Sequence, residues 1–149
     1  MRIEDEIKQD NFGNEYQKLA INQLFTGKWV SDLIASHLKP YGLSSQQYNV
    51  LRILRGARPE ALTVNAICER MIDKMSNVSR LVDKLILKDL VIRKVNFNDR
   101  RQMDIEITKK GLNILKEIDE KDSLLFDNFS NLSIEEAREL NNLLDKLRG

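Results

Sequence analysis

The sequence has 149 residues, the length of one domain with a substantial core rather than of two ordinary domains. Hydrophobic residues make up 42% and charged residues 32%, which is typical of a folded protein and not of a disordered one. No apolar run approaches the ~18 residues of a membrane span, the N-terminus lacks a signal peptide's apolar segment, and a lone cysteine, Cys68, cannot form an internal disulfide. These features disfavour a membrane or exported protein and predict a cytoplasmic one.

The net charge of +1 conceals an uneven distribution. Residues 70–110 carry 11 basic and 6 acidic side chains, residues 111–149 carry 5 basic and 9 acidic ones, and residues 1–69 are balanced. A basic middle predicts a surface that meets an anion. Chance clustering of solvated charges explains this distribution, taken alone, equally well.

The N-terminal third of the sequence predicts two helices. Apolar residues recur every four positions over 15–39, the pattern of a long amphipathic helix, which residues 40–42 end. Ser44 with Gln47 three residues later is a capping box at the start of a second helix, and Gly56 is expected to close it.

Two shorter helices are predicted next. Thr63 can cap the first, and Asp73 can cap the second, over 73–90. The apolar side of this second helix is expected to consist of Met75, Val78, Leu81, Val82 and Leu85.

The periodicity then changes from that of a helix to that of a strand. Apolar and polar residues alternate over 103–107, as in a half-buried antiparallel strand, and residues 91–97 are its expected partner. Thr108 can cap a further helix that reaches Phe129, and Ser133 begins a last one with a second capping box. The predicted fold class is therefore mostly α with a small β-hairpin.

Two short helices joined by a tight turn and followed by a hairpin form a winged helix-turn-helix, whose second helix is the candidate for the DNA major groove. Its polar side offers short donors and acceptors for bases or phosphates, an arginine able to contact guanine or phosphate, and lysines that add charge. These predicted DNA contacts are Lys74, Ser76, Asn77, Ser79, Arg80 and Lys84. The alternative is that serine and asparagine act as caps and that Arg80 is merely solvated.

Arg100 and Arg101 lie at the predicted tip of the hairpin, where a hydrophobic core gains nothing from them. An arginine there can enter a narrow minor groove, whose negative potential attracts it. Asp99 is expected to orient one guanidinium group through a fork-type pair. The alternative is an ordinary charged turn with an exposed ion pair worth about 0–1 kcal/mol.

At these residues the sequence resembles the MarR family of transcription regulators. The run ICERMIDKMSNVSRLVDKLILKDLV is similar to the family's helix-turn-helix, with SRLVDKL at the recognition helix, and DRRQMDIEITKKG is similar to its wing. The segment YGLSSQQYNVLRIL resembles the one that precedes them. Two turns depart from the family pattern, because Ile72-Asp73-Lys74 and Lys88-Asp89-Leu90 stand where relatives commonly have a glycine.

The resemblance implies a homodimer that binds double-stranded DNA and usually represses nearby genes. It implies one domain over 1–149, with dimerisation helices at about 1–40 and 112–149 and the winged helix-turn-helix at about 41–111. It also implies that Asp99 and Arg101 are the paired wing residues.

Many relatives respond to small aromatic or phenolic acids bound between these two regions. The corresponding positions here would include Trp29, His37, Tyr41 and Tyr48, which could line an effector pocket. Aromatic residues on a helical stripe are more often core, and packing is the favoured interpretation of all four. Cys68 is expected to be a small buried hydrophobe.

The sequence lacks the motifs of an enzyme, such as a glycine-rich phosphate loop, a nucleophile elbow or a Cys–His pair. With one His and one Cys, no zinc-type metal site is expected, and no cofactor is predicted. Two other functions remain open on the same fold. They are a sequence-tolerant DNA-coating or architectural protein and a protein-binding module that has lost its affinity for DNA.

Overall fold

The computed structural model describes residues 1–97 and 99–149. The chain separates into two compact units, Met1–Leu115 and Lys116–Gly149. The first unit contains the predicted winged helix-turn-helix, and the boundary between the units falls inside one helix, Lys109–Asp119.

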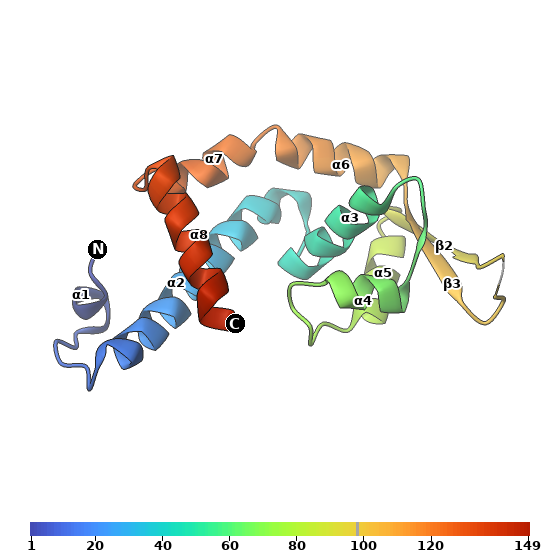
Figure 1. Ribbon diagram of the computed structural model, residues 1–149. Coiled ribbons are helices and arrows are strands. Elements are labelled where there is room, and N and C mark those ends of the chain that lie inside the picture. The colour runs from blue at the N-terminus through green and yellow to red at the C-terminus, as the bar shows by residue number, and fades with distance from the viewer. Residues whose placement is uncertain (98) are drawn as a thin grey trace. The chain divides into compact units, whose positions relative to one another are not determined.

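The first unit is largely helical (Figure 1). The long helix predicted over 15–39 is confirmed, with Asn14 as its cap, and both halves of the capping box at Ser44 are present. Gly56 does not close the second helix, which continues through Ala57. In chain order the elements are α1 (Ile3–Ile7), α2 (Glu15–Leu38), η1 (Lys39–Tyr41), α3 (Ser45–Ala57), α4 (Val64–Arg70), α5 (Val78–Ile86) and α6 (Lys109–Asp119).

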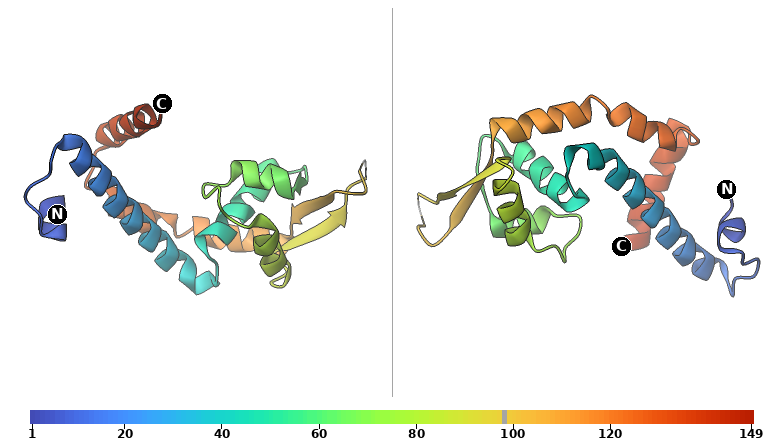
Figure 2. Two further views of the ribbon diagram at one scale, coloured as in Figure 1. Left: turned by 90° about the horizontal axis from the view of Figure 1, so that it is seen from below. Right: turned by 180° about the vertical axis from the view of Figure 1, so that it is seen from behind.

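The predicted hairpin is confirmed as β2 (Val91–Val95) and β3 (Met103–Ile107), paired antiparallel with Val91 opposite Ile107. A third strand, β1 (Leu62–Thr63), pairs with the other edge of β3. A strand of two residues is too short to show an alternating pattern, so the sequence did not predict β1. The hairpin projects beyond α5 in every view (Figures 1 and 2).

The core of the first unit lies where α3, α4 and α5 meet the sheet. The side chains at its centre are fully removed from solvent, which is the main stabilising term for a unit of this size. They include Val50, Leu51, Leu54, Ile67, Val82, Leu85, Leu90 and Ile105. This packing places α5 on the outside of the unit with its polar side toward solvent.

The predicted start of α5 at Asp73 is wrong. The helix begins at Val78 with Asn77 as its cap, and residues 73–77 form a separate turn. Met75, predicted on the apolar side, is 92% exposed, because the side chain of Asp73 accepts hydrogen bonds from within this turn and closes it as a local structure.

The junction between α5, the hairpin and α6 depends on close backbone approach. Thr108 donates its hydroxyl to the carbonyl of Asp89 and accepts from the N–H of Gly111, which confirms Thr108 as a cap. A Cβ at Gly111 would lie 2.4 Å from the carbonyl oxygen of Leu90, so only glycine fits. Asp89 adopts a left-handed φ of 59°.

The second unit holds α7 (Asp122–Phe126), η2 (Asp127–Phe129) and α8 (Ile134–Arg148). The continuous helix predicted from Thr108 to Phe129 is wrong, because α6 ends at Asp119. Residues 119–123 contain no apolar side chain that could continue the buried stripe past Ile118. The capping box at Ser133 is confirmed. Within the described ranges, no helix has the length and apolar character needed to cross a membrane.

Candidate nucleic-acid interface

The turn before α5 is held by its own side chains. Asp73 accepts from the backbone N–H of Met75 at 3.0 Å and from the hydroxyl of Ser76 at 3.0 Å. Lys74 donates to the carbonyl of Glu69 at 2.6 Å, and Asn77 caps α5 by accepting from the N–H of Arg80 at 3.1 Å. Lys74, Ser76 and Asn77 therefore have structural partners already, as the capping alternative predicted for asparagine.

The structure brings the predicted contacts of α5 to one surface. Ser79, Arg80 and Lys84 are exposed on the helix. A hollow of about 290 Å³ lies beside them and is lined by Gln46, Asp73, Ser76, Asn77, Arg80, Leu81 and Lys84. Gln46 comes from α3, and its place here could not be inferred from a helical pattern.

An ion pair joins the hairpin to α5. The guanidinium Nη2 of Arg93 on β2 lies 2.7 Å from Oδ1 of Asp83 on α5, and the side chains are 32% and 60% exposed. Because it links two elements that also pack together, the pair orients the hairpin relative to the helix, although its net stabilisation is modest at this exposure. The sequence pattern does not predict this pair, since the two residues belong to different elements.

The tip of the hairpin is braced by Asp99. Its carboxylate accepts from the backbone N–H of Arg101 at 3.0 Å and from the side-chain amide of Gln102 at 3.0 Å. These two hydrogen bonds lower the pKa of the Asp99 carboxyl below its usual value, so it is ionised at neutral pH. The expected fork-type pair with an arginine is absent among the described residues, because the turn geometry directs both carboxylate oxygens to the backbone and to Gln102.

The cations of this surface fall into two groups. Arg93 and Lys94 form ion pairs with Asp83 and Glu106. In contrast, Arg80 and Lys84 on α5 and Arg100 and Arg101 at the hairpin tip are exposed and have no carboxylate partner in the part of the chain that the structure describes. Such unpaired cations can bind an external anion without first breaking an internal ion pair.

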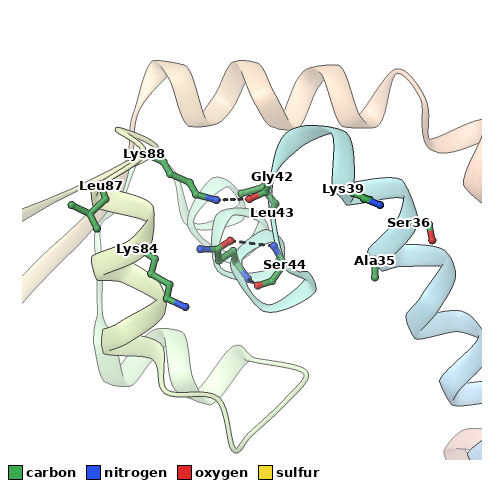
Figure 3. A pocket seen from close by; sticks show the side chains of 10 residues that line it. Ala35, Ser36, Lys39, Gly42, Leu43, Ser44, Lys84, Leu87 and Lys88 are labelled. Carbon is green, nitrogen blue, oxygen red and sulfur yellow. Dashed lines mark hydrogen bonds between the residues drawn. The ribbon is translucent and has the colours of Figure 1, made fainter.

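A second hollow, of about 720 Å³, lies between α2, the start of α3 and the end of α5 (Figure 3). Lys84 and Lys88 line one side, and Ala35 and Ser36 of α2 line the other. Lys88 donates a hydrogen bond to the carbonyl of Gly42, which closes one end.

The four predicted effector residues do not line this hollow. Trp29 is 37% exposed, and His37, Tyr41 and Tyr48 are half-buried. Tyr48 accepts a hydrogen bond from Arg52, whose guanidinium group also lies 5.6 Å from the centre of its ring.

Cys68 is half-buried in α4 rather than fully buried as expected. Within residues 1–97 and 99–149, no group of three or more His, Cys, Asp or Glu side chains could hold a metal ion.

Comparison with known proteins agrees with this arrangement. The family model described as "MarR family" matches residues 41–102, which include α3 through β2 and end just before β3. Over these residues the chain is similar to the MarR family. The family's transcription regulators are not enzymes, as the sequence predicted.

Two curated relatives are HTH-type transcriptional regulators. MhqR of Bacillus subtilis strain 168 is 31% identical over 91 residues, which is 60% of this chain and 60% of MhqR. SarZ of Staphylococcus epidermidis is 28% identical over 129 residues, which is 85% of each chain.

Among solved structures, the E. coli MarR mutant in complex with operator DNA has the same fold. It has a TM-score of 0.79 and 24% identity, and the alignment covers 93% of this chain and 99% of that one.

Proposed function

We propose that this protein is a cytoplasmic, homodimeric regulator that binds a two-fold operator in double-stranded DNA and represses the adjacent genes. The observation that carries the proposal is the set of unpaired cations on α5 and at the hairpin tip, Arg80, Lys84, Arg100 and Arg101. In this proposal α5 enters the major groove and the hairpin tip enters the neighbouring minor groove. The MarR mutant of E. coli, which shares this fold, was crystallised with operator DNA, and this supports the assignment.

The proposed DNA contacts fall into groups with different chemical roles. Arg80 and Ser79 lie at the start of α5 and would read base edges, whereas Lys84, one turn later, would contact a phosphate. Lys74, Ser76 and Asn77 would present the backbone of the turn to the DNA, since their side chains already have partners. Asp99 would hold the hairpin tip in shape, and Arg100 and Arg101 would meet the minor groove.

Exposed apolar side chains support the homodimer. On α2, Tyr16 and Leu24 are 83% and 76% exposed, which is costly in a monomer. The second unit exposes a larger set, namely Leu124, Phe126, Phe129, Leu132, Ile134, Leu140, Leu143 and Leu147. We propose that residues 1–40 and 112–149 supply the dimer interface and residues 41–111 the DNA-binding region.

We also propose that a small aromatic or phenolic acid releases the protein from DNA. Lys84 supports this, because it lines both the 720 Å³ hollow beside α2 and the 290 Å³ hollow at the DNA-facing side of α5. A carboxylate bound to Lys84 in the larger hollow would compete with a DNA phosphate for the same ammonium group. The aromatic side chains at Trp29, His37, Tyr41 and Tyr48 would contribute only if the ligand extended beyond this hollow.

Selection from a random duplex library at about physiological salt tests the function, because non-specific binding is weak there. Enrichment of an inverted repeat, with half-sites about one helical turn apart, is the expected result. Retained DNA without a consensus would instead indicate a coating or architectural protein. Failure to retain any DNA would reject the proposal and favour a protein-binding module.

A further inference from the structure

The hairpin tip carries a large apolar side chain that the proposed DNA contacts do not explain. Phe97 is 95% exposed, more than any other aromatic residue in the described part of the chain. Burial of a phenylalanine side chain stabilises a folded protein, so the exposure of Phe97 forgoes a substantial stabilisation. It comes two residues after the end of β2 and three residues before Arg100.

The described polar residues around Phe97 are engaged with one another. The Asn96 side chain donates to Asp104 at 2.9 Å and accepts from the N–H of Asp99 at 2.8 Å, and the Asn96 N–H donates to the carbonyl of Gln102 at 3.0 Å. With the two hydrogen bonds of the Asp99 carboxylate, these contacts brace the tip internally. Among the described residues of this turn, Phe97, Arg100 and Arg101 keep their side chains exposed.

The combination of one exposed aromatic ring and two exposed arginines favours binding to nucleic acid rather than to a protein surface. Apart from Phe97, the apolar exposure of the hairpin is limited to Val95 and Ile92, which are 58% and 41% exposed, and a protein-docking patch is normally larger. The adjacent Arg100 and Arg101 carry two positive charges without a carboxylate partner among the described residues, which complements a phosphate-lined groove. A minor groove about 6 Å wide admits a hairpin tip and a single ring but excludes a helix.

We propose that Phe97 is an apolar wedge that enters the operator's minor groove and opens a flexible pyrimidine–purine base step, while Arg100 and Arg101 hold the tip on the flanking phosphates and groove walls. Apolar side chains inserted in this way partly unstack a step and bend the duplex toward the major groove. Pyrimidine–purine steps deform at least cost, so the wedge contributes specificity at bases that receive no hydrogen bond. The inference rests on the proposed operator binding and adds a specificity-determining residue to it.

The test compares Phe97→Ala with the wild type and with Arg101→Ala on the selected operator across a salt series. We expect Phe97→Ala to lower affinity about tenfold at every salt concentration, because the lost contact is apolar. Its log–log salt slope should remain that of the wild type, whereas Arg101→Ala should reduce the slope by ~0.9. Ile92→Ala is the matched control, an exposed apolar residue at the other end of β2, and should bind as the wild type does.

A second measurement reports on the base step itself. With 2-aminopurine at the step under the wing, wild-type binding should raise fluorescence by unstacking the base, and Phe97→Ala should remove that rise. One outcome would reject the wedge and leave the proposed function intact. In that outcome the wild type binds the operator and Arg101→Ala weakens binding, but Phe97→Ala matches the wild type in affinity and fluorescence. Loss of dimer or of melting temperature in Phe97→Ala would assign Phe97 to protein packing and also overturn the wedge. Absence of wild-type binding would reject the function itself.

Discussion

The winged helix-turn-helix and the flanking helices use apolar residues in different ways. Around α3, α5 and the sheet, side chains such as Leu51, Val82 and Ile105 are completely buried within one chain. Along α2 and α8, residues of the same type, such as Leu24 and Leu143, are 76% and 55% exposed. The first set of apolar residues forms a closed core, whereas the second forms an open, exposed stripe that a second copy would cover in the proposed homodimer.

The largest expected effect comes from placing a charge on the open stripe. In Leu143→Glu on α8, a carboxylate would have to be buried unpaired in the dimer, so sedimentation should show a monomer. Operator affinity should fall by about 10²–10⁴-fold, because one protein no longer engages both half-sites together. Ile72→Glu, at a position 88% exposed in the first unit, is the control and should remain dimeric. A dimeric Leu143→Glu would contradict the assigned interface.

The closed core should respond differently from the open stripe. Leu51→Ala removes a fully buried side chain and should lower the free energy of unfolding by about 2–5 kcal/mol in any oligomeric state. Leu140→Ala on α8, at a residue 43% exposed in the single chain, should cost less than about 1 kcal/mol in the Leu143→Glu background. Chemical denaturation of the variants measures both values. Equal costs in that background would remove the distinction between the two regions.

Within the first unit, a substitution at the hairpin tip should lower operator affinity without lowering the stability of the fold. Arg101 is exposed and its guanidinium has no partner among residues 1–97 and 99–149, so Arg101→Ala should leave the melting temperature and the dimer unchanged. It should weaken operator binding by about 10–100-fold, the range for loss of one specific arginine contact. Lys28→Ala removes the same charge from α2 and should not alter affinity. A parallel loss of fold and binding in Arg101→Ala would mean that the arginine is structural.

A smaller effect is expected at the turn that ends α5. Asp89 has a left-handed φ of 59°, which glycine adopts without strain and alanine does not. Asp89→Gly should raise the free energy of unfolding by about 0.5 kcal/mol, and Asp89→Ala should lower it by about 1 kcal/mol. Thermal unfolding of the two variants gives the order, and a more stable alanine variant would exclude backbone strain at this residue.

The smallest effect concerns the N-terminal helix. Lys18, whose ammonium lies 2.6 Å from Glu4, acts together with a backbone hydrogen bond and with Arg2 to lower the pKa of that carboxyl from its ordinary 4.5 to about 2. Because the folded pKa is the lower one, the stabilisation is complete above pH 4.5 and is lost as the pH falls toward 2. Amide NMR signals of α1 should report its detachment over that interval. Glu4→Gln should remove this pH dependence, and an unchanged titration in that variant would assign the transition to another group.

Periodicity and capping residues were sufficient to predict most of the fold. The bounds of α2, the caps at Ser44, Thr63 and Ser133, and the hairpin all depend on residues within a few positions of one another, so the sequence alone determined them. The same holds for Arg80, Arg100 and Arg101 as exposed cations, because a charge at the polar position of a helix or at the tip of a hairpin cannot be buried cheaply.

The features that the sequence did not predict depend on competing local hydrogen bonds or on tertiary contacts between elements. α5 starts at Val78 and not at the predicted Asp73, because the Asp73 side chain closes its own turn. Asp99 accepts hydrogen bonds from the backbone N–H of Arg101 and from the side chain of Gln102 instead of pairing with a guanidinium group. Asp83 forms an ion pair with Arg93, which lies on another element. Whether an apolar stripe is core or interface also depends on what packs against it, which is why Leu51 and Leu143 look alike in the sequence and differ in the fold.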